Sequence, residues 1–88
     1  MYNLKKLKSD TNKVCRMAEA GKGLFSDAAV NWADFSCHDA QYVLHADGSE
    51  SYRVLIEEAN PDNREVIEFI AEELSIRGYK DIEVEFQW

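Results

Sequence analysis

The chain has 88 residues, which leaves room for one hydrophobic core and argues against a second domain. Hydrophobic residues make up 45% of it, a share that argues against intrinsic disorder, and no apolar run approaches the roughly 18 residues that span a bilayer. Two cysteines are too few for the disulfide framework of a small secreted protein. We therefore expect a single cytoplasmic domain over residues 1–88, with no membrane partner and with Cys15 and Cys37 reduced and buried.

The net charge of −7 is unevenly distributed along the chain. Through Lys22, six basic residues outnumber two acids, whereas the rest of the chain holds fifteen acids and four bases. Such a polarised charge distribution governs solubility and the choice of partners rather than the fold.

The first element is predicted to be a basic amphipathic helix over residues 3–20. Its apolar positions recur every three or four residues: Leu4, Leu7, Thr11, Val14 and Ala18. Gly21 is expected to end it as a left-handed cap. Ser9–Asn12 offers an alternative start, which would leave residues 1–8 as an extended arm.

Residues 24–38 alternate in two registers, with Val30 and Trp32 in one and Phe35 and Cys37 in the other. This pattern favours a bulged strand, and the alternative is a short helix capped by Ser26.

A hairpin is predicted next, because Asp47-Gly48 lies between two apolar segments, 41–46 and 51–58. A two-residue turn would place Leu44 opposite Ser51 and mismatch the apolar faces. A three-residue loop over 46–48, with Gly48 left-handed, puts the apolar residues on one face. These residues are Ala40, Tyr42, Leu44, Tyr52, Val54 and Ile56.

The last two elements are predicted to be an acidic helix over residues 61–77 and a strand over 81–88. Asn60-Pro61 is typical of a helix start, and Gly78 is expected to end the helix with Tyr79 folding back on Leu74. The final segment alternates apolar and polar residues. The predicted fold is α+β, in the order α-β-β-β-α-β, with a mainly antiparallel sheet and both helices on one face; residues 28–88 contain the sheet and the acidic helix.

No motif predicts a catalytic residue, a cofactor or a metal. Cys37-His38-Asp39 has the residue types of a thiol triad, but neighbours on a strand point to opposite faces. Zinc ligands normally come in closely spaced pairs, which Cys15, Cys37, His38 and His45 do not form. Glu83 and Glu85 are interpreted as an exposed strand face rather than an acid–base pair.

The helix over 61–77 carries the candidate binding surface. Its buried stripe runs from Val66 to Leu74, carboxylates occupy the opposite face, and two large apolar residues border them. The candidate partner-binding residues are Glu65, Glu68, Phe69, Glu72, Glu73 and Ile76. One interpretation is a solvated face, with Phe69 and Ile76 packed against the first helix; the other is an interface for a basic partner.

The expected element order resembles that of double-stranded RNA-binding domains, whose second helix supplies lysines. Here that helix carries glutamates, which disfavours direct nucleic-acid binding. In size, acidity and lack of a catalytic motif, the chain resembles phage and mobile-element inhibitors of host defence, including anti-CRISPR proteins and DNA mimics. This resemblance implies a non-enzymatic inhibitor that docks on a basic, nucleic-acid-binding host or phage protein. The alternatives are a structural homo-oligomer such as a homodimer and, less favoured, a small enzyme or ligand-binding domain.

Overall fold

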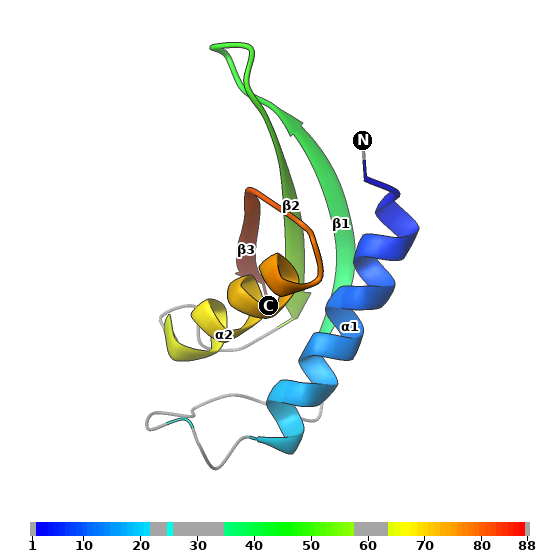
Figure 1. Ribbon diagram of the computed structural model, residues 1–88, viewed down its shortest axis with the longest axis vertical. Coiled ribbons are helices and arrows are strands. Elements are labelled where there is room, and N and C mark those ends of the chain that lie inside the picture. The colour runs from blue at the N-terminus through cyan, green and yellow to red at the C-terminus, as the bar shows by residue number, and fades with distance from the viewer. Residues whose placement is uncertain (1, 22–24, 26–34, 58–63, 88) are drawn as a thin grey trace.

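The structure is a computed structural model, and it describes residues 2–21, 25, 35–57 and 64–87. Within these ranges the elements are α1 (Leu4–Ala20), β1 (Ser36–Leu44), β2 (Glu50–Glu57), α2 (Arg64–Ile76) and β3 (Ile82–Gln87) (Figure 1). The predicted α+β class is confirmed. No helix in the described ranges is long and apolar enough to cross a membrane.

The sheet has the order β1-β2-β3 and is mixed, not mainly antiparallel as expected. β1 and β2 pair antiparallel, and β2 and β3 pair parallel. The parallel pair follows from the position of α2 between the two strands, because a helical crossover returns the chain to the end of the sheet where β2 began.

The separate strand predicted within residues 24–38 is not seen in the described part of that segment. Ser36–His38 form the start of β1 instead, and the strand continues through a bulge between Cys37 and Asp39. The bulge changes which side chains of β1 face the core, from Cys37 before it to Ala40 after it. Residues 26–34 of the predicted strand lie outside the described residues.

The hairpin between β1 and β2 has the predicted three-residue loop. His45 N–H donates to the Ser49 carbonyl at 2.9 Å and Gly48 N–H donates to the His45 carbonyl at 3.0 Å, which leaves residues 46–48 as the loop. Gly48 adopts a φ of 88°, the left-handed conformation that this loop requires. Tyr42 pairs with Tyr52 and Ala40 with Val54, as the expected apolar face requires, whereas Leu44 pairs with Glu50 and is 65% exposed.

The ends of the two helices agree only in part with the predictions from the sequence. α1 begins at Leu4 and is capped by Asn3, whose side chain accepts a hydrogen bond from Lys6 N–H, so residues 4–8 are not an extended arm. Gly21 is not left-handed, since its φ is −100°. At the other helix, Gly78 has a φ of 96° and Tyr79 N–H donates to the Leu74 carbonyl, as predicted. Asn60-Pro61 lies outside the described residues.

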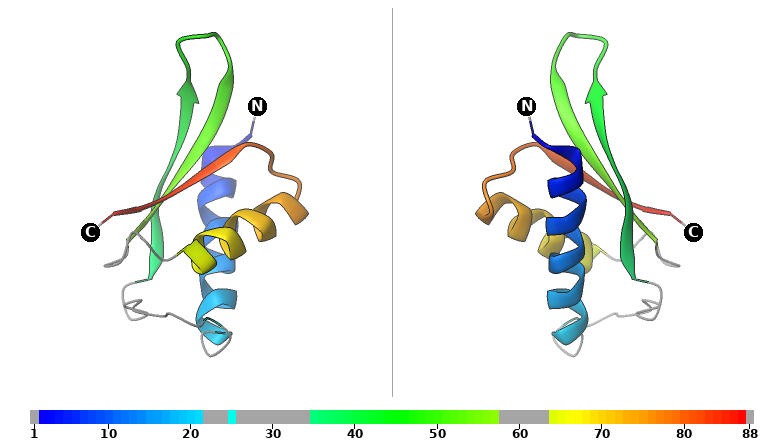
Figure 2. Two further views of the ribbon diagram at one scale, coloured as in Figure 1. Left: turned by 90° about the vertical axis from the view of Figure 1, so that its left-hand side faces the viewer. Right: turned by 90° about the vertical axis from the view of Figure 1, so that its right-hand side faces the viewer.

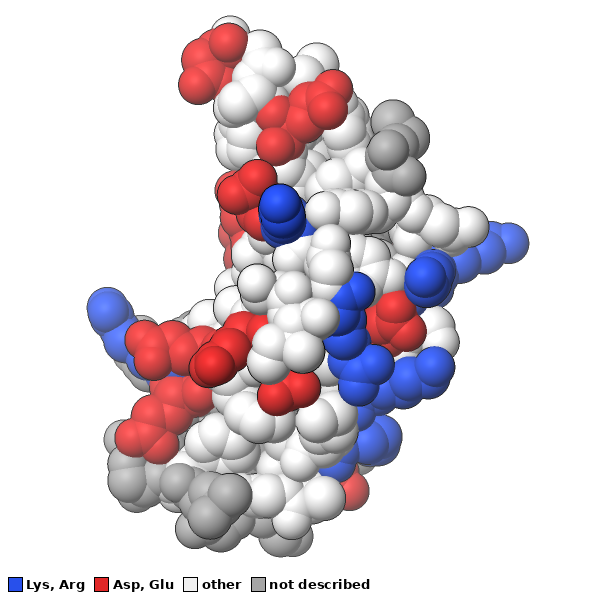
Figure 3. Space-filling model, viewed as in Figure 1, with Lys and Arg blue, Asp and Glu red and all other residues white. Residues whose placement is uncertain are grey.

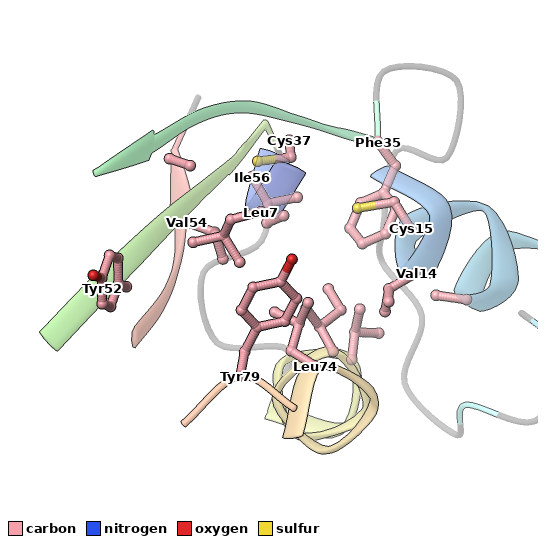
Figure 4. Packing of buried hydrophobic residues seen from close by; sticks show 14 residues of the cluster. Leu7, Val14, Cys15, Phe35, Cys37, Tyr52, Val54, Ile56, Leu74 and Tyr79 are labelled. Carbon is pink, nitrogen blue, oxygen red and sulfur yellow. The ribbon is translucent and has the colours of Figure 1, made fainter. Parts of the chain in front are cut away.

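Both helices lie on the same side of the sheet, as predicted, and cross each other there (Figure 2). Leu7 and Val14 of α1, Val54 and Ile56 of β2, and Leu74 of α2 are fully buried between the layers (Figure 4). The hairpin extends beyond the helices and lengthens the molecule to 39 Å, against 22 and 18 Å in the other directions (Figure 1). The opposite face of the sheet, which carries Arg53, Glu83 and Glu85, has no helix packed on it in the described residues.

Candidate functional site

The acidic face of α2 is formed by the periodicity of the helix. Val66, Ile70 and Leu74 point into the core with no exposed surface. Glu65, Glu68 and Glu72 are exposed, and their spacing of three and four residues places them along one face, about 10 Å from first to last. Glu73 is half-buried. The face therefore presents a row of carboxylates held by a rigid, well-packed helix.

The two apolar residues predicted to border this row differ in their surroundings. Phe69 is half-buried, packs against the core and makes an edge-to-face contact with Phe25, with ring centroids 5.7 Å apart. Ile76, at the last residue of α2, is 71% exposed. Phe69 is thus already engaged within the chain, whereas Ile76 leaves a large apolar surface beside the acids.

The opposite charge gathers on α1. Lys5, Lys6, Lys8, Lys13 and Arg16 are exposed along this helix. Within α1, Arg16 lies 3.3 Å from Glu19 and Lys13 lies 3.8 Å from Asp10. Figure 3 shows most of the basic residues over the side of the molecule where α1 lies, and most of the acidic residues over the other side and the hairpin end. The asymmetry along the sequence is therefore also an asymmetry in space.

Glu83 and Glu85 do not extend the α2 row, because they lie on the open face of the sheet. Arg53 of β2 contacts both, at 3.0 Å and 3.4 Å. His45 Nε2 lies 3.8 Å from Glu83 and 2.7 Å from the Ser51 hydroxyl. This face is a cross-strand network in which one guanidinium partly balances two carboxylates.

A cluster of tyrosines at the start of α1 was not predicted as a site. The Tyr2 ring lies 4.8 Å from that of Tyr52 and 5.0 Å from that of Tyr79, and Tyr42 lies 5.6 Å from Tyr52. Burial and a hydrogen bond to Asp10 raise the pKa of Tyr79 to about 12. No local pattern marks this cluster, because Tyr2 and Tyr79 are separated by most of the chain.

Two shallow hollows open beside the cluster. One, of about 340 Å³, is lined by Tyr2, Glu50, Tyr52, Lys80 and Asp81. The other, of about 490 Å³, is lined by Ala71, Ser75, Tyr79, Lys80, Asp81 and Ile82. They share Lys80 and Asp81, so together they connect the outer part of α2 with the tyrosine rings.

The cysteines are buried and free, as predicted. Burial raises the pKa of Cys15 to about 12 and the pKa of Cys37 above its ordinary value, which is opposite to the shift that activates a nucleophile. The Cys37 thiol donates to the Asp39 carbonyl at 3.2 Å, and His38 is exposed, so these neighbours do not converge as a triad. Among the described residues, no group of three or more His, Cys, Asp or Glu side chains is arranged to hold a metal ion.

The chain matches no family model, and neither a curated protein nor a solved structure matches it.

Proposed function

We propose that the protein is a non-enzymatic binding protein that recognises a basic protein through the exposed face of α2. The row of Glu65, Glu68 and Glu72 carries this proposal, because it lies on a helix whose other side is fully buried in the core. A rigid row of like charges attracts and orients a partner of opposite sign. Ile76, 71% exposed, supplies an apolar contact next to that row.

The partner proposed is a nucleic-acid-binding protein, and the role is inhibition. The lysines and arginines that bind backbone phosphates also bind carboxylates, so an acidic helix competes with nucleic acid for the same groove. This is the mode of action of DNA mimics and of some anti-CRISPR inhibitors, the class that the chain resembles. We place this action in the cytoplasm, where the free thiols Cys15 and Cys37 stay reduced.

Charge reversal on α2 tests the surface. Glu68→Lys/Glu72→Lys should lose a partner captured from host lysate by the unchanged protein, with little change in thermal stability, because exposed charges contribute little to folding. Glu57→Lys/Glu85→Lys makes the same change in net charge on the open face of the sheet and should retain the partner. Binding by the unchanged protein should weaken as salt rises, since exposed charges are screened over about 8 Å at physiological ionic strength. Loss of the partner only by the sheet variant would refute the proposed surface.

The two apolar residues beside the row are tested separately. Ile76→Ser should weaken partner binding and leave the melting temperature unchanged, because its side chain is already in water. Phe69→Ala should lower the melting temperature, because it removes the contact with Phe25. A Phe69→Ala protein that keeps its melting temperature and loses its partner would make Phe69 an interface residue instead.

Self-association is the second candidate function, and the hairpin favours it. Leu44 is 65% exposed on a hairpin that extends beyond the helices (Figure 1). Exposed apolar residues on projecting strands promote pairing between copies. Sedimentation at increasing protein concentration should then show a dimer that Leu44→Lys abolishes; a monomer throughout would exclude this candidate.

A further inference from the structure

We infer that the hollow lined by Tyr2, Glu50, Tyr52, Lys80 and Asp81 binds a guanidinium group, as presented by an arginine side chain of the partner. This inference rests on the proposed function in that the partner is basic. It adds a second contact point, apart from the α2 row, and it names the side chain recognised there.

The aromatic walls of the hollow are held in place by hydrogen bonds. The Tyr2 N–H donates to the Tyr52 hydroxyl at 2.9 Å, and the rings are inclined at 48° with centroids 4.8 Å apart. The Tyr2 hydroxyl donates to the Gly78 carbonyl at 3.3 Å and accepts from Lys80 N–H at 2.9 Å. These hydrogen bonds join three distant segments of the chain, so the rings need little rearrangement when a ligand binds.

The charges that line the hollow favour a cation. Glu50 and Asp81 contribute two carboxylates against the single ammonium of Lys80. Among the described residues, neither carboxylate forms an ion pair with a lysine or arginine within 4.0 Å. Interaction with the Glu50 carboxylate raises the pKa of Tyr42 to about 12, and the Asp81 carbonyl accepts from Tyr52 N–H at 3.3 Å.

Guanidinium fits these walls better than ammonium does. It is planar and weakly hydrated, it stacks on aromatic faces, and its forked N–H groups match a carboxylate. The ammonium of lysine is a strongly hydrated point charge that gains less from a ring face. Tyr52 is 8% exposed and packs against Tyr2, so the half-buried Tyr2 ring beside the two carboxylates is the aromatic surface that favours arginine.

The position of the hollow connects it to α2. The second hollow shares Lys80 and Asp81 with it and reaches Ala71 and Ser75. These two residues are helical neighbours of Glu68 and Glu72, each at a spacing of three. A partner segment that lies along the acidic row and crosses this second hollow would bring an arginine to the hollow beside Tyr2.

The probe for the test is N-acetylarginine amide, with N-acetylcitrulline amide as its uncharged analogue. Titration followed by NMR should shift the Tyr2 and Tyr52 ring signals and the Lys80 and Asp81 amides with the arginine probe alone. Equal shifts with both compounds, or none at millimolar concentrations of the arginine probe, would overturn the inference.

Three conservative variants test the charges. Glu50→Gln and Asp81→Asn remove one carboxylate each and should each weaken binding of the arginine probe roughly three- to tenfold. Asparagine tolerates the left-handed backbone of Asp81, whose φ is 57°, so the loop keeps its shape. Lys80→Gln removes the competing cation and should strengthen binding about twofold. Stronger binding by Glu50→Gln together with weaker binding by Lys80→Gln would show an anion site and contradict the inference.

Glu57→Gln is the matched control, because it makes the same change in charge at an exposed position of β2 outside the hollow and outside the α2 row. It should leave probe binding unchanged. If the probe fails to bind while Glu68→Lys/Glu72→Lys still loses the partner, the guanidinium site is wrong and the proposed function stands. If the probe binds as described while the α2 reversal keeps the partner, the acidic row is wrong and the site stands.

Discussion

Asn12 joins α1 to the bulge of β1, and its replacement tests how that bulge is held. Its side-chain oxygen accepts from Cys37 N–H at 2.8 Å, and its side-chain nitrogen donates to the Cys37 carbonyl at 3.2 Å. One half-buried amide therefore satisfies both backbone groups of Cys37, next to the shift in register between Cys37 and Asp39. Asn12→Ala leaves these groups without their partner.

The expected loss is about 2 kcal/mol of unfolding free energy. Two hydrogen bonds contribute about 0.5–1.5 kcal/mol each, and leaving partly buried groups unsatisfied adds to the cost. The higher helix propensity of alanine offsets roughly 0.5 kcal/mol of this loss in unfolding free energy. For a domain of this size, the melting temperature followed by circular dichroism should fall by roughly 8–16 °C.

Two further variants separate the hydrogen bonds from other effects. Lys13→Ala, at an exposed neighbouring position, should change stability little. Asn12→Asp keeps an acceptor but places a carboxylate against the Cys37 carbonyl. The folded state then favours the protonated form of the introduced aspartate. The free energy of unfolding should therefore be low at neutral pH and recover as the pH falls toward about 4. If Asn12→Ala is as stable as Lys13→Ala, the amide does not hold the bulge.

Three other changes have expected outcomes. Leu7→Ala, at a fully buried position, should cost about 3–5 kcal/mol in urea denaturation; a loss below about 1 kcal/mol would contradict its central place in the core. Gly78→Ala should cost about 1–2 kcal/mol, because its φ of 96° is unfavourable for alanine; unchanged stability would mean that the helix end rearranges. The fold favours protonated Cys15 and Tyr79, with pKa values raised from 9.0 and 10.0 to about 12. Stability should therefore hold below about pH 9 and fall between about pH 9 and 12, and an unchanged urea midpoint at about pH 11 would contradict this.

Local sequence patterns were sufficient to predict the structural features that depend only on residues close in the sequence. The loop over 46–48 was predictable because only that length aligns Tyr42 with Tyr52, and Gly48 supplies its left-handed backbone. The end of α2 was predictable because glycine after a helix commonly adopts the left-handed conformation, as Gly78 does and Gly21 after α1 does not. The acidic row on α2 was also predictable, since a spacing of three and four residues places side chains on one face of any helix.

The tertiary structure decided what each element packs against. Periodicity marks the buried side of a strand but not its neighbour, so the parallel pairing of β2 with β3 could not be read from the sequence. The same limit applies to Asn12 and Cys37, to Arg53 between two glutamates, and to the Tyr2 and Tyr52 pair, 50 residues apart. Such contacts form only when distant segments are brought together by burial of the shared core. The acidic row on α2 is therefore determined by the local sequence, whereas the tyrosine-lined hollow exists only in the folded protein.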